Sequence, residues 1–546
     1  MTHEARTRTR VLIIGAGPTG LAMAIELGHR GIPCVLVERN ARTGFAPRAK
    51  TTNVRTREHL RRWGIAQELR KASPLGVDYP SNVLFVTRLA GWELARIENA
   101  LYCAPGKNPL YSEHAQWIPQ YTVEEVMRAH AQTLPGVELR FNSELTGFEQ
   151  DARGVVAQVR GADGVHSIAC DFLVGADGAR SFVREAIGAR LEGSYGLSRN
   201  YNVVFRAPGL AQAHRHGPAI MYWQVNGDVP SIIGPMDRGD TWFFMPTAVA
   251  TGTHFSAGDA PDLIRRSSGI DLPFEVLSSD EWTASRLLAN RYRDRRVFLV
   301  GDACHLHPPF GGYGMNMGVA DSVDLGWKLA ALLQGWGGPA LLDSYEIERR
   351  PVHEMVLEEA VSNHQLLGNQ LWRPGLEDEG DAGERLRAEI GARIAQAKVR
   401  EFDTLGVVLG YRYGSSPVIV ADGTPAPAHD FINYVPTARP GSLAPHAWLH
   451  DGSSLYDHFG AGFTLLATGD APEDELDRAR AAARDAGVPL TVLRPREGAI
   501  ADLYRARLSL VRPDQHVAWR GDVWPADGAG LWATVTGRAE AVVQCV

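Results

Sequence analysis

The sequence predicts an α/β fold with more than one domain, and three observations support this. Short apolar runs at 11–14, 172–174 and 297–300 each end in a glycine-containing turn, and each turn is followed by a helical pattern. Runs of this size are typical of buried parallel strands whose sheet is covered by helices. Residues 200–290 hold alternating runs, at 202–206, 219–224, 231–233 and 241–245, that predict a β-sheet.

The first strand runs directly into a glycine-rich turn with the spacing Gly-x-Gly-x-x-Gly. Its glycines are Gly15, Gly17 and Gly20. A helix is predicted from there to about residue 30, and a second strand, 34–37, ends at Glu38. The glycines permit a tight turn, close approach of a pyrophosphate and tight helix–strand packing. This order of elements is the fingerprint of a dinucleotide-binding βαβ unit.

The nature of the dinucleotide is less clearly marked. The helix that opens at Pro18 and Thr19 would hold a pyrophosphate on its free N–H groups, and Glu38 can accept hydrogen bonds from ribose hydroxyls. The fingerprint alone does not separate NAD from FAD, but its place at the start of the chain favours a flavoprotein. An NADP enzyme would prefer a basic residue at the position of Glu38. Because Arg39 follows directly, Glu38 is only weak evidence against NADP.

Two further motifs lie far downstream. Asp177 and Gly178 follow the strand 172–174, at the strand end where open α/β sheets bind ligands. Gly301 and Asp302 follow 297–300, and this carboxylate can hold a sugar hydroxyl. The loop after them carries Pro308, Pro309, Gly312, Gly314, Met315 and Asn316. Its glycines let a planar group lie against main chain, and the N–H groups that open the next helix would stabilise negative charge on a reduced ring.

Together these motifs resemble the FAD-dependent aromatic hydroxylases, the group A flavoprotein monooxygenases that include para-hydroxybenzoate hydroxylase and phenol hydroxylase. The resemblance covers essentially the whole chain. It implies that the first glycine turn and Glu38 bind the ADP half of FAD. It also implies that the Asp177–Gly178 element serves both FAD and NAD(P)H, and that Gly301–Asp302 bind the ribityl chain.

The same resemblance singles out residues that have no local signal of their own. Arg48 would lie near the flavin and the arriving nicotinamide, and Gln120 would touch the ribityl chain and the ring. Arg48 and Pro309 are the candidates nearest the flavin, and no catalytic side chain is assigned because the cofactor carries the chemistry. Tyr313 and Asp324 depart from the family, which often has Gln or Lys and Asn there.

The activity implied is that of a monooxygenase that consumes NAD(P)H and O2 and hydroxylates a phenolic or other aromatic small molecule. NAD(P)H would bind transiently and reduce FAD, and reaction with O2 would give a C4a-hydroperoxyflavin that transfers oxygen to the ring. Water must be kept out, because otherwise the hydroperoxide decays to H2O2. His114, Tyr102 and Tyr222 are candidates to activate a substrate hydroxyl, and the sequence does not choose among them.

The expected domain layout is an α/β chain with a βαβ dinucleotide-binding FAD domain, an inserted and mostly β substrate domain, and a C-terminal thioredoxin-like domain. The FAD domain would be discontinuous, over 1–77, 112–190 and 290–370. The substrate domain would take 78–111 and 191–289, with Tyr222, Phe244 and Pro308 at an apolar pocket. Residues 371–399 would form a linker and surface helix. Residues 400–546 would form the thioredoxin-like domain, which has no Cys-x-x-Cys pair.

Three alternatives stay open at this stage. The same scaffold can serve a Baeyer–Villiger, epoxidising or antibiotic-modifying monooxygenase that acts on a polyketide-like substrate. It can also serve a flavin reductase without oxygenation, or a protein that binds FAD without catalysis. NAD(P)H and O2 consumption, measured with and without candidate phenols, would separate these classes.

The composition argues against several classes of binding partner. A net charge of -7 argues against nucleic acid and anionic membranes, which require a basic face. The five cysteines are scattered, so no metal site is expected and a reducing cytoplasm is favoured. No signal peptide or membrane span of about 18 apolar residues is predicted. The expected partners are an aromatic small molecule, O2 and NAD(P)H, with a homodimer left open.

Overall fold

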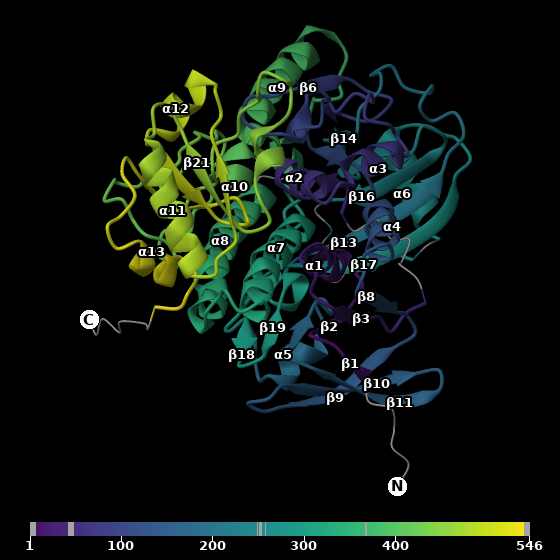
Figure 1. Ribbon diagram of the computed structural model, residues 1–546. Helices are drawn as coiled ribbons and strands as arrows, with labels where there is room; N and C mark the ends of the chain where they lie inside the picture. Colours follow the sequence, from purple (N-terminus) through teal and green to yellow (C-terminus); the bar gives the residue numbers. More distant parts are fainter. Residues whose placement is uncertain are drawn as a thin grey trace.

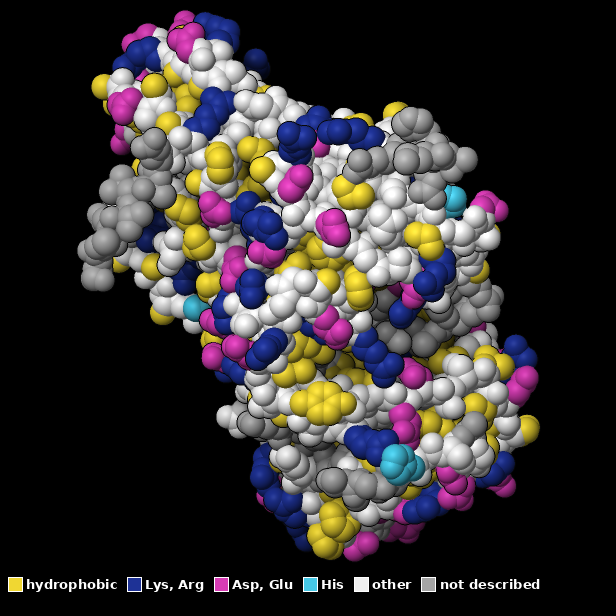
Figure 2. Space-filling model, turned by 90° about the horizontal axis from the view of Figure 1, so that it is seen from below, with side chains coloured by type: hydrophobic (Ala, Val, Ile, Leu, Met, Phe, Trp, Pro, Cys, Tyr) yellow, Lys and Arg dark blue, Asp and Glu magenta, His cyan; other side chains and the backbone are white. Residues whose placement is uncertain are grey.

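The structure is a computed structural model that describes residues 7–41, 49–247, 249, 254–256, 258–365 and 368–539. Within these residues the strands form five sheets. Figure 1 shows the C-terminal unit, in yellow, on one side of the long helices α7 (Gly314–Leu333) and α8 (Pro339–Gln365), and the largest sheet on the other. Figure 2 shows one face of the molecule, on which acidic and basic side chains are interspersed.

A six-stranded sheet with the order β18-β19-β12-β2-β3-β8 forms the centre of the βαβ region. Its strands are β18 (Arg293–Asp294), β19 (Val297–Leu299), β12 (Phe172–Gly175), β2 (Val11–Ile14), β3 (Cys34–Val37) and β8 (Val137–Arg140). All pairs are parallel except β18 with β19. Every residue of β2, β3, β12 and β19 is buried, which explains why these strands appear in the sequence as continuous apolar runs.

Helices and a second sheet cover the two faces of this sheet. The helices of the region include α1 (Pro18–His29), α4 (Gln120–Ala131) and α5 (Phe182–Ala186). Helices α1 and α7 pack closely, because a Cβ at Gly326 would lie 2.6 Å from the Glu26 Cγ. The second sheet has the order β1-β11-β10-β9, and its Leu145, Val155 and Ile168 join the same apolar core. Its strands are β1 (Thr7–Arg8), β9 (Glu144–Gln150), β10 (Val155–Gly161) and β11 (Gly164–Cys170).

The largest sheet has eight strands in the order β20-β17-β13-β16-β15-β14-β5-β6. They are β5 (Val83–Val86), β6 (Glu93–Ile97), β13 (Leu191–Arg206), β14 (Met221–Gln224), β15 (Ser231–Pro235), β16 (Thr241–Pro246), β17 (Glu275–Ala289) and β20 (His305–Leu306). One face packs on helix α6 (Ala260–Ser268), whose Ile264 lies in the core on that side. The other face packs toward the loop before α7, through Phe310 and Tyr313.

Smaller elements connect these layers. The strand pair β4 (Thr51–Thr52) and β7 (Gln116–Trp117) lies beside the loop before α7. Helices α2 (Val54–Arg62) and α3 (Ala66–Lys71) follow β4. The predicted surface helix is α9 (Gly380–Phe402), which buries Ile390 and Ile394. Helix α9 reaches β6 so closely that a Cβ at Gly391 would lie 2.0 Å from the Leu94 carbonyl oxygen. Helix α10 (Leu405–Gly410) comes next.

The C-terminal unit is a small α/β sheet with the order β22-β21-β23-β24. Its elements are β21 (Phe463–Ala467), α11 (Glu473–Asp485), β22 (Leu490–Leu493), α12 (Gly498–Tyr504), β23 (Leu508–Val511), β24 (Val517–Gly521) and α13 (Gly528–Val535). Strands β21 and β22 are parallel, and β23 and β24 are antiparallel. This is the expected thioredoxin-like arrangement. Its core includes Trp327 and Trp336, so it packs directly on the α7–α8 region.

The strands found agree with those expected from the apolar runs, with ends that differ by at most two residues except in β13, which begins eleven residues earlier. No apolar run predicted β17, a strand of fifteen residues whose first half is largely exposed. Among the described residues, no helix combines the length and the apolar character that a membrane span requires.

Candidate active site

The parallel register brings the three glycine-containing turns to one edge of the six-stranded sheet. Gly175 pairs with both Ile14 and Leu299, so β2, β12 and β19 end side by side. Each turn begins within two residues of its strand end. Segments that lie far apart in the sequence therefore meet where open α/β sheets bind their ligands.

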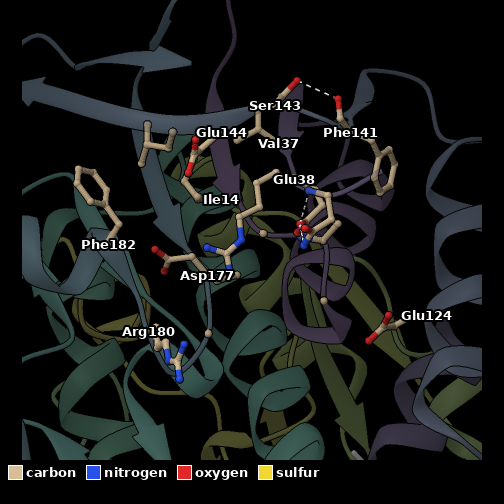
Figure 3. Close-up of a pocket in the computed structure, with 18 of the residues that line it drawn as sticks. Ile14, Val37, Glu38, Glu124, Phe141, Ser143, Glu144, Asp177, Arg180 and Phe182 are labelled. Carbon is tan, nitrogen blue, oxygen red and sulfur yellow. Dashed lines mark hydrogen bonds between the residues drawn. The ribbon is translucent and has the colours of Figure 1, made fainter. Parts of the chain in front are cut away.

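A cavity of about 410 Å³ opens at this edge. Of the residues expected to bind a cofactor, it is lined by Gly15, Gly17, Glu38, Arg39, Gln120, Asp177 and Gly178. Figure 3 shows Glu38 and Asp177 projecting from different strand ends around this cavity, with Arg180 on the Asp177 side. The first two motifs and Gln120 therefore share one binding space, whose volume lies in the usual range for small-molecule sites.

The glycines of the first turn leave room for a ligand and for close packing. Gly15 has a φ of +104°, and a Cβ there would lie 2.5 Å from the Ala176 carbonyl oxygen. A Cβ at Gly20 would lie 1.9 Å from the Gly15 carbonyl oxygen. At Gly17 a Cβ would meet nothing within 4 Å, so this face of the backbone is open. Since α1 begins here with Pro18, its first N–H groups and dipole suit a pyrophosphate.

The Glu38 carboxylate accepts hydrogen bonds from the backbone that lines the cavity. One carboxylate oxygen accepts a hydrogen bond from the Ala16 N–H at 3.0 Å. The other accepts from the Asn40 backbone at 2.9 Å and from its side-chain amide at 2.8 Å. The carboxylate is thus fixed beside the glycine turn, at the end of β3, where a ribose would lie. These three contacts leave one of the carboxylate's roughly four lone-pair sites for a further hydrogen bond.

Asp177 also organises local backbone. Its carboxylate accepts from the Ser181 hydroxyl at 2.5 Å and from the Val183 N–H at 3.0 Å. Ser181 in turn caps α5 by accepting from the Arg184 N–H at 2.9 Å. Burial raises the pKa of Asp177 despite these hydrogen bonds. The main role visible for this side chain is to shape the turn that carries Gly178 into the cavity.

The third motif lies against the first through Thr19. A Cβ at Gly301 would lie 2.6 Å from the Thr19 hydroxyl oxygen, and a Cβ at Gly318 would lie 2.3 Å from it. Asp302 itself is exposed at the carboxyl edge. The Gly301–Asp302 turn and the start of α1 are therefore neighbours, so one extended cofactor can reach both.

A buried polar network anchors the Gly301 turn. Asp321 on α7 accepts from the Gly301 N–H at 3.0 Å, His305 at 2.8 Å, Arg349 at 2.8 Å and His353 at 2.9 Å. Burial would raise the pKa of Asp321, but His353 and Arg349 hold it well below its usual range. Cys304, His305 and Asp321 lie close enough to share a metal ion. The carboxylate oxygens are already engaged by these four donors, so the cluster is better explained as a support for the turn.

The conformation of the loop before α7 depends on two glycines and on hydrogen bonds made by Asn316. Gly311 and Gly312 have φ values of +88° and +66°. Asn316 donates to the Thr51 carbonyl at 2.9 Å and the Gly312 carbonyl at 2.6 Å, and accepts from the Asn53 N–H at 3.0 Å. Its side chain is therefore structural, and the N–H groups of α7's first turn remain for a ligand. Met315 and Pro309 are half-buried and Pro308 is buried in the same stretch.

Comparisons with known proteins agree with this geometry. A family model described as FAD binding domain matches residues 8–360, and one described as aromatic-ring hydroxylase, C-terminal, matches residues 437–539. Tetracenomycin B2 monooxygenase-dioxygenase from Streptomyces olivaceus is 34% identical, over 98% of this chain and 99% of that protein.

The chain belongs to the FAD-dependent aromatic-ring hydroxylases.

Two solved structures extend the likeness to the whole fold. RebC with bound 7-carboxy-K252c superposes with a TM-score of 0.91 and 35% identity, over 98% of this chain and 100% of that one. A ternary complex of aklavinone-11 hydroxylase with FAD and aklavinone gives a TM-score of 0.82 and 30% identity, over 98% and 100%. The protein is thus an FAD-dependent monooxygenase that acts on an aromatic substrate, with NAD(P)H as reductant. The first glycine turn, Glu38 and the cavity fit the ADP half of FAD.

The hydroxylase carries a different set of aromatic side chains toward the flavin loop than we expected. Successive residues of a strand point to opposite faces. Tyr222 and Phe244 lie in the core under α6, away from the loop, and the Tyr222 hydroxyl donates to the Gly217 carbonyl at 2.5 Å. These two side chains therefore lie on the face of the sheet opposite the loop, and their place in a substrate pocket stays a prediction. Their neighbours Trp223 and Phe243 lie on the inner face, in the cluster with Phe310.

The inner face is a continuous apolar row across four strands. Register pairs Met245 with Ile232, Ile232 with Trp223, and Trp223 with Phe85. The Trp223 ring also lies near the Phe310 ring, tilted by 40° to it, with centroids 6.2 Å apart. The sequence predicts these strands but not which residue of each pair faces the loop, because both residues of each neighbouring pair are aromatic. Only the position of Phe310 identifies the inner face.

The remaining candidate residues are Arg48, Gln120, His114 and Tyr102. Arg48 lies outside the described residues. Gln120 opens α4 and donates to a Glu124 carboxylate oxygen at 2.7 Å. His114 is buried, with Nδ1 2.7 Å from the Ala115 carbonyl oxygen, and burial lowers its pKa. Burial raises the pKa of Tyr102, and a hydrogen bond with Asp403 raises it further. Of the three side chains considered for activating a substrate hydroxyl, Tyr102 is the one on the inner side that carries a carboxylate partner.

Proposed function

We propose that this hydroxylase adds oxygen to a fused-ring phenol of the polyketide kind, with FAD, NAD(P)H and O2. The observation that carries the proposal is the apolar row Met245–Ile232–Trp223–Phe85, which crosses four adjacent strands. Strands lie about 4.8 Å apart, so the row extends for about 14 Å. A surface of that length matches several fused rings better than a single phenol ring.

Several relatives support this substrate class, whereas two others are named for single-ring phenols. The names of the similar proteins refer to tetracenomycin B2 and aklavinone. The inner face also suits the chemistry, because a wide apolar wall excludes water from the reacting atoms. When FAD is bound it supplies the oxygen-transfer chemistry. The protein binds and orients the substrate and keeps water away from it.

The roles of the site residues follow from their positions. The Gly15–Gly20 turn, Pro18 and Thr19 hold the pyrophosphate at the start of α1, and Glu38 holds the adenosine ribose. The Gly301–Asp302 turn, fixed by Asp321, holds the ribityl chain. The loop from Pro309 to Gly314 and the N–H groups that begin α7 hold the flavin ring. Gln120 lines the same cavity and contacts the ribityl chain. The resemblance to the family also assigns Arg48 to the flavin, although Arg48 lies outside the described residues.

The proposal extends to the cell compartment and the assembly. Cys34, Cys103, Cys170 and Cys304 are free and buried, which suits the reducing cytoplasm. A homodimer is the assembly we expect there. Light scattering on the purified flavoprotein measures it directly, and a monomer mass at micromolar concentration contradicts it.

The test of the function uses the purified yellow protein with NADPH or NADH in air. Hydroxyanthraquinones serve as fused-ring phenols, and 2,4-dichlorophenol serves as a single-ring control. We expect a fused-ring phenol to stimulate reductant oxidation, with O2 uptake matched by a product one oxygen atom heavier. Reductant oxidation that yields only H2O2 with every ligand contradicts monooxygenation. Coupled turnover of the single ring alone contradicts the proposed substrate class.

A further inference from the structure

Large apolar side chains line the cofactor cavity, and the roles proposed above do not use them. They include Phe141, Leu145 and Phe182. The glycine turn and Glu38 are assigned to the pyrophosphate and the ribose of FAD, which leaves the adenine ring of its ADP half without a named contact. The faces of adenine are flat and stack well on aromatic side chains. An aromatic wall of the cavity is therefore the place to look for this contact.

Phe182 presents a largely open aromatic ring to the cavity. It is 42% exposed and lines the cavity. Figure 3 shows it at the edge of the cavity, on the side of Asp177 and Arg180. The cavity and the exposure of Phe182 together give a flat group room to lie against the ring.

The backbone on both sides of Phe182 is fixed by hydrogen bonds. Phe182 is the first residue of α5, and Ser181 before it accepts the Arg184 N–H at 2.9 Å. The Val183 N–H after it donates to Asp177 at 3.0 Å. The ring is therefore carried on a turn that is already ordered, and such preorganisation lowers the cost of binding.

Phe141 is the other phenylalanine of the cavity, and its ring is engaged differently. The Arg128 guanidinium carbon lies 3.9 Å from the Phe141 ring centroid, so one face of that ring is covered. Phe141 is also less exposed than Phe182, and it packs against the apolar core of the six-stranded sheet. A stacking ligand thus has better access to Phe182, and Phe141 provides a matched control.

We infer that the Phe182 ring is the platform on which an adenine ring stacks when a dinucleotide is bound. The inference rests on the proposed placement of the ADP half of FAD in this cavity. Stacking on an aromatic ring needs no hydrogen bonds to the base, so it adds to the contacts of the glycine turn and Glu38. FAD and NAD(P)H both carry adenine, and the experiment distinguishes these two sources.

The experiment measures dinucleotide binding in two ways. FAD is titrated into the apoprotein and followed by flavin fluorescence. NADPH and NADH are then mixed with FAD-saturated protein without oxygen, and their dissociation constants are taken from the rate of flavin reduction at each concentration. The variants are Phe182→Leu, which removes the flat ring, and Phe182→Tyr, which keeps it, with Phe141→Leu as the matched control. Circular dichroism and thermal unfolding report the fold of each variant.

We expect Phe182→Leu to weaken binding of FAD or of the reductant about fivefold, because leucine keeps apolar contact but loses the stacking face. Phe182→Tyr and Phe141→Leu should both bind within about twofold of the wild type, since the aromatic ring at position 182 remains. Weaker FAD binding assigns the stacked adenine to FAD. Weaker reductant binding with unchanged FAD affinity assigns it to NAD(P)H.

Two results would overturn the inference. If Phe182→Leu binds FAD and both reductants as the wild type does, no adenine stacks on this ring. If Phe182→Tyr or Phe141→Leu loses as much affinity as Phe182→Leu, the loss does not come from the flat ring at position 182.

The outcomes also separate this inference from the proposals on which it rests. If Glu38→Ala weakens FAD binding but Phe182→Leu changes no dissociation constant, the stacking contact alone is wrong. If Phe182→Leu weakens FAD binding but Glu38→Ala does not, the ribose assignment alone is wrong. A wild type that shows Phe182-dependent binding but oxygenates no aromatic ligand contradicts the proposed function alone.

Discussion

At the scale of single residues, Glu38 supports the fold and is also proposed to bind the cofactor. It accepts the Ala16 N–H at 3.0 Å and also lines the cavity. We expect Glu38→Ala to weaken FAD binding about tenfold, which corresponds to about 1.4 kcal/mol. The loss arises because the ribose loses an acceptor and the glycine turn loses its anchor. Titration of the apoprotein with FAD, followed by flavin fluorescence, measures it.

Glu144→Ala is the matched control for this experiment. Glu144 lines the same cavity, but it is exposed and its ion pair with Arg160 is long, at 3.6 Å. The control should bind FAD within about twofold of the wild type, since an exposed pair of this kind contributes little. Equal affinity in both variants would show that Glu38 does not hold the ribose.

Glu26 is the residue whose charge state most clearly links pH to stability. It is fully buried between Arg62 at 2.6 Å, Arg30 at 2.7 Å and the Trp63 indole N–H at 2.7 Å. Burial would raise the pKa of Glu26, but Arg62 and Arg30 outweigh it and lower the pKa to about 2. Its folded-state pKa is therefore below the unfolded value of about 4.5, so its contribution is present above pH 4.5 and is lost as the pH falls toward 2.

This prediction is tested with Glu26→Gln. At pH 7 we expect the variant to be less stable by about 3 kcal/mol, because each unit of pKa difference corresponds to about 1.36 kcal/mol. The gap to the wild type should shrink as the pH falls below 4.5. Thermal unfolding from pH 7 to pH 3 measures it, with the exposed Glu68→Gln as control. A gap that stays constant over this range would contradict the assignment.

At the scale of elements, the two faces of β16 have separate tasks. Phe243 meets the flavin loop side, and Phe244 packs under α6. We expect Phe243→Leu and Phe244→Leu each to lower stability by about 1 kcal/mol, since both remove buried apolar volume. Only Phe243→Leu should raise the share of reductant oxidation that ends as H2O2, because only that side chain lies on the face proposed to meet the substrate.

The measurement pairs H2O2 production with product yield, alongside thermal unfolding. We expect the H2O2 share to at least double in Phe243→Leu and to stay at the wild-type level in Phe244→Leu. Uncoupling of the same size in both variants would mean that it follows general loss of stability. The proposal that the Phe243 face of the sheet meets the substrate would then be wrong.

At the scale of the whole molecule, a buried ion network joins the C-terminal unit to the long helices. Arg512 donates to Glu348 at 2.6 and 2.9 Å and to Asp324 at 3.2 Å, and it also pairs with Asp514. Lys328 pairs with Asp324 at 2.8 Å and with Glu348 at 2.6 Å. Asp324, which departs from the usual Asn of the family, is thus part of this interface. Arg512 and Lys328 lower the pKa of Glu348 against the effect of burial.

Removal of Arg512 should therefore be costly. We expect Arg512→Met to lower the free energy of unfolding by about 3–5 kcal/mol, because buried carboxylates lose their cation. Adding Glu348→Gln and Asp514→Asn should recover part of the loss. Arg520→Met, which breaks the Asp422 pair within the C-terminal unit, should cost about 1 kcal/mol or less. Denaturant unfolding and limited proteolysis would report these differences, and equal losses in Arg512→Met and Arg520→Met would contradict the importance of the interface.

Much of the cofactor region could be predicted because its signals are local. The Gly15 turn, the strand 34–37 and Glu38 belong to one βαβ unit, and the spacing of its glycines reports backbone contacts made within that unit. The same holds for the strand ends that carry Asp177 and Asp302. That these turns lie close together could also be predicted, since parallel strands of one sheet have their carboxyl ends at the same edge.

The substrate side could not be settled in this way. Tyr222 and Trp223 are both aromatic, as are Phe243 and Phe244, so alternation marks a strand without saying which face meets the flavin loop. Local spacing thus determined the cofactor-binding turns, whereas contacts between distant segments decided which side chains surround the substrate, because a side chain's facing depends on the element that packs against it.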